Sequence, residues 1–191
     1  MSGVAPADYG ATRLSRDDLR GLVRTVPDFP IPGIQFRDIT TLIGHGPGLA
    51  SSIAHLADIA RPLGADLIAG MEARGFIFGA SVAAHMGLGF LPVRKPGKLP
   101  VETIGVDYDL EYGVDRLEID ANVVRPGQRV LIIDDLIATG GTAQATVRLL
   151  RQAGAQVTNA LFVIELPDLG GAARLRDDGL EVHSLMHFEG D

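Results

Sequence analysis

Apolar and polar positions divide the chain into alternating blocks. Short, continuous apolar runs are typical of strands buried on both faces, and apolar residues at helical spacing indicate the helices that cover them. The predicted strands are residues 66–71, 90–93, 130–133, 156–166 and 180–185. The predicted helices are residues 15–25, 48–63, 143–153 and 170–179, with a further helix that ends at His85. This order predicts an α/β fold with a doubly wound, mostly parallel sheet and flanking helices.

Two segments interrupt this alternation. Residues 27–41 contain three prolines within six residues, which excludes a helix and disfavours a central strand. Residues 101–120 alternate between apolar and polar positions and predict a hairpin with its bend near residues 111–113. Because this hairpin falls outside the α/β pattern, it is a candidate lid over a site.

The length and composition of the chain fit a single domain. With 191 residues, of which 46% are hydrophobic, the chain can bury a sizeable core. We expect one domain over residues 1–191. Its N-terminal helix and proline-rich segment would occupy about 15–45, and its α/β core with the hairpin about 48–191.

The charge and the N-terminal sequence narrow the classes of partner. A net charge of −7 argues against a nucleic-acid or membrane surface, because both need basic patches. No apolar run approaches the ~18 residues of a membrane span, and residues 1–10 lack the basic-then-apolar order of a signal peptide. The chain has no cysteine, which excludes disulfides and thiolate chemistry and fits a cytoplasmic protein.

The most informative stretch is residues 130–142. Four apolar residues run into Asp134 and Asp135, and because an unpaired carboxylate is costly to bury, we expect the strand to end before this pair. The glycine-rich loop of residues 138–142 opens a helix, so its amides and two threonine hydroxyls form an anion nest. In open α/β sheets, ligands bind at the edge formed by the carboxyl ends of the strands, which is where these residues would lie. A phosphorylated sugar would satisfy both the carboxylates and the nest.

Plainer interpretations stay open for each polar stretch. The glycine-rich loop could be a turn without a ligand, although two bare carboxylates beside it favour a site. Two other phosphate motifs, G-x-x-x-x-G-K-[ST] and a strand-following G-x-G-x-x-G, are absent from the sequence. Glu72 and Arg74 could form a surface pair, and Arg94, Lys95 and Lys98 a solvated face. Each group nevertheless follows a buried strand, so we expect both near an anionic ligand.

Residues 130–142 resemble the signature with which type I phosphoribosyltransferases bind 5-phosphoribosyl-1-pyrophosphate (PRPP). The likeness lies in the four apolar residues, the acidic pair and the small Thr-Gly-Gly-Thr loop. It implies a loop that holds the 5′-phosphate and carboxylates that address the ribose hydroxyls. The residues so implicated are Asp134, Asp135, Ala138, Thr139, Gly140, Gly141 and Thr142.

Residues 27–41 resemble the adenine-binding hood of adenine phosphoribosyltransferases, through a Pro-Gly pair followed by Phe-Arg-Asp. The likeness implies that the backbone of Gln35 and Arg37 reads the base edge and that Phe36 stacks on the base. It also implies that Leu166 closes the far side of the base pocket. From its residues alone, this segment is equally a connector that packs its aromatic side chains into the core.

The likeness extends to the leaving-group side and to the lid. The implied pyrophosphate-binding residues are Glu72, Ala73, Arg74, Arg94, Lys95 and Lys98. Arg74 is also implied as catalytic, because it would offset the charge of the leaving group. The hairpin resembles the family's mobile catalytic loop, including its Glu-Tyr-Gly. Glu111 is therefore the implied acid/base near the purine, and Tyr112 the implied lid residue. From sequence alone, both could equally be ordinary turn and strand residues.

These resemblances together imply an enzyme that condenses adenine with PRPP to give AMP and pyrophosphate. They also imply a homodimer, and magnesium that is chelated by PRPP rather than by direct protein ligands. Three alternatives stay open. The hood disfavours a different acceptor base, such as guanine, hypoxanthine or orotate. The length and charge disfavour a PRPP-sensing regulator with a DNA-binding domain. A plain nucleotide-binding module is separated from an enzyme only by the turnover of Glu111→Ala and Asp134→Ala variants.

Overall fold

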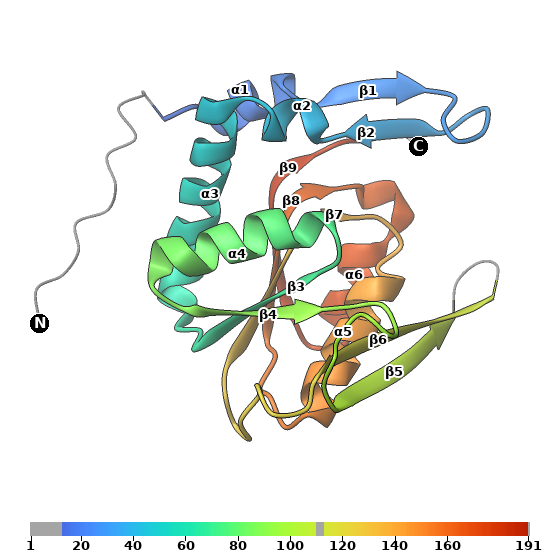
Figure 1. Ribbon diagram of the computed structural model, residues 1–191. Coiled ribbons are helices and arrows are strands. Elements are labelled where there is room, and N and C mark those ends of the chain that lie inside the picture. Colours follow the sequence, from blue (N-terminus) through green and yellow to red (C-terminus); the bar gives the residue numbers. More distant parts are fainter. Residues whose placement is uncertain (1–12, 110–112, 191) are drawn as a thin grey trace, which may run out of the picture.

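The computed structural model describes residues 13–109 and 113–190, and its central element is a five-stranded sheet (Figure 1). The strands are β3 (Leu67–Met71), β4 (Gly89–Val93), β7 (Val130–Ile137), β8 (Asn159–Glu165) and β9 (Glu181–His187). They lie in the order β4-β3-β7-β8-β9, and each neighbouring pair is parallel. The predicted doubly wound sheet is confirmed, and it is parallel throughout.

Helices cover both faces of this sheet (Figure 1). One face carries α5 (Gly141–Gln152) and α6 (Gly171–Asp177), and the other carries α3 (Gly46–Ala60) and α4 (Arg74–Met86). The shorter helices are α1 (Arg16–Gly21), α2 (Thr40–Ile43) and two 3-10 turns, η1 (Arg61–Leu63) and η2 (Pro167–Leu169). None of the helices described combines the length and apolar character needed to cross a membrane.

Strand β7 explains the continuous apolar run in the sequence. Val130 and Ile132 belong to the core beneath α5 and α6, whereas Leu131 and Ile133 belong to the core beneath α3 and α4. Successive side chains of a strand point to opposite faces, so a strand covered on both faces needs apolar residues at every position. The four apolar residues therefore serve two separate cores.

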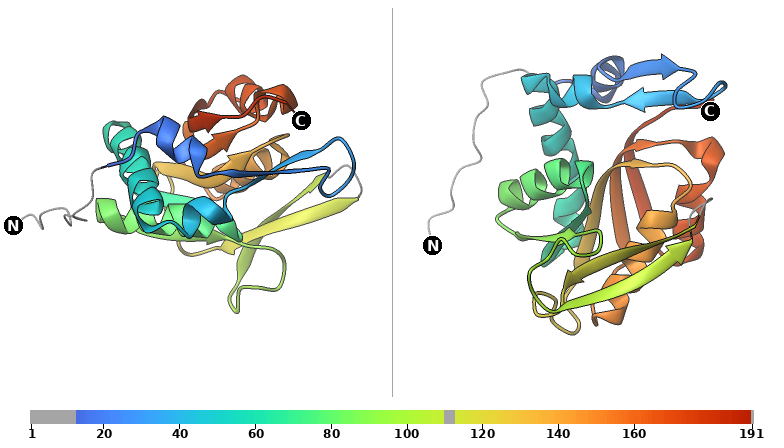
Figure 2. Two further views of the ribbon diagram at one scale, coloured as in Figure 1. Left: turned by 90° about the horizontal axis from the view of Figure 1, so that it is seen from above. Right: turned by 45° about the vertical axis from the view of Figure 1, so that its right-hand side comes forward.

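Two hairpins project from the same side of the molecule (Figures 1 and 2). The first pairs β1 (Arg24–Pro27) with β2 (Gln35–Asp38), and the second pairs β5 (Thr103–Asp109) with β6 (Val114–Asp120). The second hairpin packs Tyr108, Leu117 and Ile119 into the core beside α5. Its antiparallel pairing is the one that the alternating pattern predicted.

The first hairpin carries the hood (residues 27–41) and is fixed at its base by Asp38. This carboxylate pairs with Arg24 on β1 and accepts a hydrogen bond from the amide of Thr40 at 2.9 Å. Hydrogen bonds from Thr40, and then from Arg24, lower the pKa of Asp38 to about 2. The carboxylate therefore stays charged at neutral pH, and this anchor stays in place.

The helix predicted over residues 15–25 is too long. It ends at Gly21, and the chain then forms β1. The physical reason is the pairing of β1 with β2 and the contact of Arg24 with Asp38. These partners lie further along the chain, beyond residue 25, so the apolar spacing within residues 15–25 carries no information about them.

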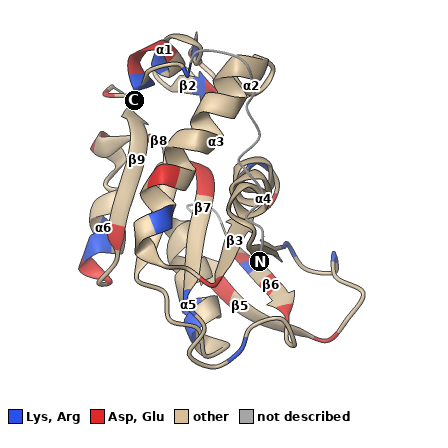
Figure 3. Cartoon of the chain, turned by 90° about the vertical axis from the view of Figure 1, so that its left-hand side faces the viewer, with Lys and Arg blue, Asp and Glu red and all other residues tan. Residues whose placement is uncertain are grey.

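The strand predicted to end before the acidic pair is too short. Strand β7 continues to Ile137, because β8 runs beside it and pairs with Asp134 and Leu136. Asp134 and Asp135 therefore lie inside the strand, as the red segment of β7 shows (Figure 3). Arg74, at the start of α4, supplies a long-range counter-charge to Asp135.

Candidate functional site

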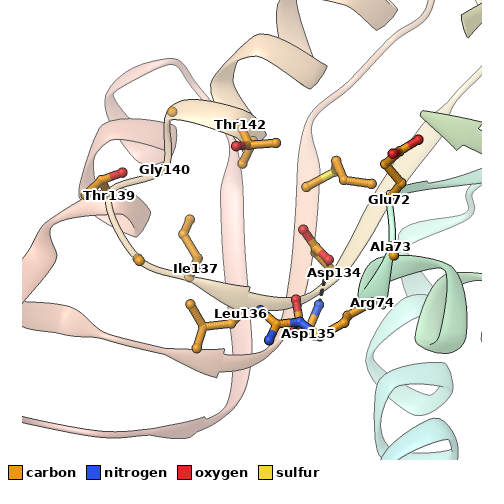
Figure 4. A pocket seen from close by; sticks show the side chains of 14 residues that line it. Glu72, Ala73, Arg74, Asp134, Asp135, Leu136, Ile137, Thr139, Gly140 and Thr142 are labelled. Atoms are coloured by element: carbon orange, nitrogen blue, oxygen red, sulfur yellow. Dashed lines mark hydrogen bonds and ion pairs between the residues drawn. The ribbon is translucent and has the colours of Figure 1, made fainter. Parts of the chain in front are cut away.

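From β3 the next strand is added on one side of the sheet, whereas from β7 the next strands are added on the opposite side, so the strand order reverses between β3 and β7. The chain passes from β3 through α4 to β4 on one side, and from β7 through α5 to β8 on the other. Ligands of such sheets bind beyond the carboxyl ends of the strands at this reversal. A cavity of about 230 Å³ lies there (Figure 4). Its lining residues are Met71, Glu72, Ala73, Arg74, Asp134, Asp135, Leu136, Ile137, Ala138, Thr139, Gly140, Gly141, Thr142 and Ala143.

The structure thus brings every predicted sugar-phosphate residue to one cavity, together with Glu72, Ala73 and Arg74. The sugar-phosphate residues lie in the last part of β7 or directly after it, and Glu72, Ala73 and Arg74 directly follow β3. Parallel strands end at the same edge of a sheet, which is why residues so far apart in the sequence meet here. The peptide bond between Glu72 and Ala73 is cis.

The loop after β7, residues 138–142 (the phosphate loop), offers free amides beside the cavity (Figure 4). Gly140 has a φ of 83°, a left-handed conformation that favours glycine, and it precedes the first residue of α5. The first amides of α5 have no acceptor within the helix. The amides of Thr139 and Gly140 also donate no hydrogen bond to another described residue. These donors and the helix dipole favour an anion at this position.

Asp134 and Asp135 form an acidic pair beside these amides, in which Asp135 is buried and Asp134 is half-buried. Asp135 is 5% exposed, and its Oδ2 lies 2.6 Å from Nε of Arg74. The guanidinium N–H is not aligned for a hydrogen bond, so this oxygen has a counter-charge but no directed donor. Burial raises the pKa of Asp135, and the nearby Arg74 only partly opposes it. Burial, followed by the charge of Asp135, raises the pKa of Asp134 well above its ordinary value.

Close packing between α4 and β7 fixes the position of Asp134. A Cβ atom added to Gly75 would collide with Oδ1 of Asp134, so only glycine allows the start of α4 to approach this carboxylate. The same oxygen accepts the backbone amide of Asp135 at 2.8 Å. The acidic pair is therefore held by backbone contacts as well as by Arg74.

Arg94 and Lys95, two of the predicted pyrophosphate-binding cations, are engaged by Glu72. Nε of Arg94 lies 2.7 Å from Oε2 of Glu72, which also accepts the amide of Lys95 at 2.9 Å. Burial alone would raise the pKa of Glu72, but these hydrogen bonds outweigh burial, and the net pKa is lowered. Glu72 thus connects the cavity to the basic loop, which we define as residues 94–98.

The side chains of the basic loop lie outside the cavity itself. Lys95 pairs with Asp115 on β6, and its Nζ lies 3.2 Å from the hydroxyl of Tyr108 on β5. Arg94, Lys95 and Lys98 are not among the residues that line the cavity, whereas Arg74 is. The structure therefore brings one of the four predicted cations to the cavity and leaves three beside it.

The predicted adenine-binding residues of the hood lie on β2, away from the cavity lining. Gln35, Phe36 and Arg37 are adjacent on this strand. The ring of Phe36 meets that of Phe29 edge-on, with centroids 5.2 Å apart. The guanidinium of Arg37 donates to the carbonyl oxygens of residues 189 and 190, each at 3.0 Å. These side chains thus bind the hood to itself and to the end of the described chain.

Leu166 follows β8 and packs against the core beneath α3 and α4. Its amide donates to the carbonyl of Ile137 at 3.0 Å, which holds it near the start of the phosphate loop. Glu111 and Tyr112 lie outside the described residues. Within residues 13–109 and 113–190, no group of three or more His, Asp or Glu side chains is placed to hold a metal ion.

The contact between α6 and the phosphate loop could not be foreseen from the sequence. The amide of Gly171 donates to the carbonyl of Ala138 at 2.9 Å, and Arg174 donates to the carbonyl of Thr139 at 3.0 Å. We expected residues 170–179 only as a short helix. The sole local signal is the pair of adjacent glycines, Gly170 and Gly171, at the start of that helix, which indicates close backbone approach but not its partner.

Comparison with known proteins identifies the relatives of this chain. A family model described as the phosphoribosyl transferase domain matches residues 43–182. The adenine phosphoribosyltransferase of Erythrobacter litoralis is 70% identical over 91% of this chain and 98% of its own length. The crystal structure of adenine phosphoribosyltransferase from Thermoanaerobacter pseudethanolicus has 46% identity and a TM-score of 0.86. That alignment covers 91% of this chain and 100% of the other.

A second solved structure carries ligands. It is the adenine phosphoribosyltransferase of Saccharomyces cerevisiae complexed with an imino-altritol bisphosphate and adenine, at 37% identity and a TM-score of 0.82. The similarity covers 90% of this chain and 98% of the yeast chain. The family-model match includes the cavity between β3 and β7, and the alignments with these relatives cover 90–91% of the chain. The chain therefore belongs to the adenine phosphoribosyltransferase family of enzymes.

Proposed function

We propose that the chain transfers the 5-phosphoribosyl group of PRPP to adenine, giving AMP and pyrophosphate. The observation that carries this proposal is the cavity between β3 and β7, where free amides at the start of α5 lie beside the buried carboxylate of Asp135 and the half-buried one of Asp134. A phosphate and the hydroxyls of its sugar are the ligand groups that suit these two features. Membership of the family supports adenine as the acceptor.

The phosphate loop binds the 5′-phosphate, through the backbone from Ala138 to Thr142 and the hydroxyls of Thr139 and Thr142. Asp134 and Asp135 accept hydrogen bonds from the ribose hydroxyls. Support comes from Oδ2 of Asp135, a buried acceptor without a directed donor, which a hydroxyl would satisfy. Binding the sugar by its phosphate and its hydroxyls orients the anomeric carbon for displacement.

Arg74, with Glu72 and Ala73, addresses the leaving pyrophosphate. The side chain of Arg74 is 48% exposed and lines the cavity, so it can meet negative charge as that charge develops. Arg94, Lys95 and Lys98 add positive charge after the first two exchange their present carboxylate partners for the ligand. The basic loop thus contributes to leaving-group binding at the expense of existing ion pairs.

Charge on the pyrophosphate is further neutralised by magnesium that PRPP carries. Magnesium favours oxygen ligands and usually keeps substrate phosphates and water in its shell rather than a cage of protein ligands. The described residues fit this pattern, because the carboxylates that line the cavity offer oxygen atoms toward it. Asp134 and Asp135 are the oxygen donors of the protein that would face such an ion.

The hood and Leu166 bind adenine. The backbone of Gln35 and Arg37 reads the edge of the base, Phe36 stacks on its face, and Leu166 closes the opposite side. Support comes from the exposed apolar side chains of the hood, such as Ile31, which is 60% exposed. Because the hood residues do not line the cavity, the proposal requires the hood to close over the base.

The chemical step is a displacement at the anomeric carbon. Its bond to a pyrophosphate oxygen breaks, and a bond to a purine ring nitrogen forms, through an oxocarbenium-like transition state as in glycoside cleavage. The ring nitrogen loses a proton, which Glu111 accepts, while Tyr112 covers the site as part of the lid. The remaining groups position the reactants and offset charge, with Arg74 as the main electrostatic contributor.

We also propose that residues 1–191 act as one domain, in the cytoplasm and as a homodimer. The helices of both layers pack on a single sheet, which supports one domain. An acidic chain without cysteine fits the cytoplasm. Resemblance to the family supports the homodimer, and sedimentation equilibrium would test it, with a single species at the monomer mass as the contradicting result.

Release of pyrophosphate from PRPP, measured base by base, tests the proposed reaction. We expect turnover with adenine, and kcat/KM at least about 100-fold lower with guanine, hypoxanthine or orotate, since a site built for one set of hydrogen bonds rejects another. No release with adenine, or faster release with another base, would contradict the assignment. Unchanged turnover of Glu111→Ala or Asp134→Ala would remove the corresponding role. Salt-dependent binding to DNA would favour a regulator instead.

A further inference from the structure

Helix α6 touches the phosphate loop at three points. The amide of Gly171 donates to the carbonyl of Ala138 at 2.9 Å. The Nη1 of Arg174 donates to the carbonyl of Thr139 at 3.0 Å. Between these bonds, a Cβ added to Gly140 would lie 2.9 Å from backbone atoms of Gly171, so the two glycines are in direct backbone contact. The loop is therefore held from α6 over three successive residues.

These contacts set the direction in which the loop amides point. The peptide bonds after Ala138 and Thr139 are trans, so in each peptide unit the carbonyl and the N–H point in opposite directions. Holding the two carbonyls therefore turns the N–H of Thr139 away from the amide of Gly171, and the N–H of Gly140 away from the guanidinium of Arg174. Both residues line the cavity, and neither amide is used by another described residue. The bonds to α6 thus prepare two donors for an anion.

We propose that Gly171 and Arg174 are positioning residues for phosphate binding, which act by holding the phosphate-loop carbonyls so that the loop amides face the ligand. This inference rests on the proposed function, since it concerns the same phosphate. Arg174 does not line the cavity between β3 and β7. It lines a second cavity of about 470 Å³ that is bordered by α5, α6 and Tyr108 of β5. The residue therefore acts through the loop and not by touching the phosphate.

A simpler explanation would be electrostatic, because any cation near the site attracts an anion. Arg148 separates the two explanations. It lines the same second cavity as Arg174 and carries the same charge, and it is exposed. Unlike those of Arg151 and Arg174, its side chain makes no hydrogen bond with another described residue. Arg148→Ala thus removes the charge without removing a bond to the loop.

The test is the affinity of the full chain for ribose 5-phosphate, measured by isothermal titration calorimetry. We expect Arg174→Ala to raise the Kd about fivefold to tenfold, the loss of one charge-assisted hydrogen bond. Arg148→Ala should stay within about twofold of the wild type. In steady-state assays, Arg174→Ala should raise the KM for PRPP by a similar factor and leave the KM for adenine unchanged. Its Tm should hardly move, because the side chain is exposed.

The outcomes are separable. Equal effects of Arg174→Ala and Arg148→Ala, or no effect of Arg174→Ala, would overturn the positioning role. Gly171→Ala gives a second test, because its Cβ would collide with the carbonyl of Ala138. We expect at least a tenfold rise in its Kd; a folded variant with wild-type affinity would also overturn the inference. Failure of the wild type to bind ribose 5-phosphate would instead contradict the proposed function.

Discussion

The phosphate loop follows β7 and the basic loop follows β4, and both stand at the same edge of the sheet. The phosphate loop lines the cavity with its own backbone, and its carbonyls are held by α6. The basic loop offers side chains instead, and two of these are engaged by carboxylates, Arg94 by Glu72 and Lys95 by Asp115. One half of the site is thus complete before a ligand arrives, whereas the other must exchange partners.

This difference follows from what each half is made of. Backbone amides at a helix start cannot be withdrawn without unfolding the turn, so they form a preorganised anion site. Long cationic side chains are mobile, and pairing them with nearby carboxylates keeps them ordered at little cost. Asp115 of the β5–β6 hairpin forms such a pair with Lys95, and red segments in Figure 3 mark the acidic residues of this hairpin. We therefore expect substitutions in the phosphate-loop half to have the larger effects.

The largest effect should come from Asp134→Asn. Losing a carboxylate that we propose binds the ribose should lower kcat/KM for PRPP by at least about 100-fold, as for other preorganised polar groups. The same change should stabilise the fold, with a Tm higher by roughly 2–4 °C, because burial and Asp135 oppose ionisation of this group. Initial rates and scanning calorimetry measure both, with the exposed Glu102→Gln as a neutral control.

The pH dependence of stability sharpens this prediction. The pKa of Asp134 is raised in the folded chain, so the folded state keeps its proton over a pH range in which the unfolded state has lost it. The free energy of unfolding should therefore fall as pH rises from the ordinary carboxyl pKa through the raised one. Asp134→Asn should flatten that part of the profile. A Tm below that of the wild type at neutral pH would contradict this account.

Gly140→Ala should have an intermediate effect. The substitution places a side chain at a φ of 83° and against the backbone of Gly171. Gly127→Ala is the matched control, since Gly127 has a φ of 78° but no atom within 4 Å of an added Cβ. Both variants carry the backbone strain of about 1–2 kcal/mol, and only the first also disturbs the loop.

We expect the Kd for ribose 5-phosphate to rise at least tenfold in Gly140→Ala and to stay near the wild-type value in Gly127→Ala. The Tm of Gly140→Ala should also be the lower of the two by roughly 2–4 °C. Similar affinities of the two variants for ribose 5-phosphate would mean that the contact with α6 does not matter for the phosphate.

The smallest effect should come from Asp115→Asn in the other half. Without this carboxylate, Lys95 no longer has to leave an ion pair to meet pyrophosphate, so the Kd for magnesium pyrophosphate should fall about two- to threefold. Asp107→Asn breaks the neighbouring pair with Arg116 and should leave that Kd unchanged. Titration calorimetry measures both constants. A Kd that rises in Asp115→Asn would show that the pair helps to bind the ligand.

The parts of the fold that could be predicted are those governed by local pattern. The apolar run from Val130 to Ile133 indicates a strand with two cores, and helical spacing indicates α3, α4 and α5. The errors arose where a distant partner decides the local structure. Strand β1 depends on β2, and the extension of β7 through Asp134 depends on Arg74 and on the length of β8. No window of neighbouring residues contains that information.

The same distinction applies to the site. The residues that line the cavity follow β3 or β7, and the sequence marks them because polar groups directly follow apolar runs. The partners of these residues carry no such mark. Asp115, which binds Lys95, looks like any hairpin carboxylate, and Arg174 looks like any exposed helical arginine. Residues that line the cavity could therefore be predicted from the sequence, whereas the residues that position them could not.

The contact between Gly140 and Gly171 constrains how the sequence can vary. Each glycine excludes a side chain at the other position, because the atoms that an added Cβ would meet are backbone atoms and cannot rotate aside. A change at one position therefore cannot be compensated by a change at the other. If both codons were randomised and clones selected for activity, we would expect glycine at both positions rather than a set of complementary pairs.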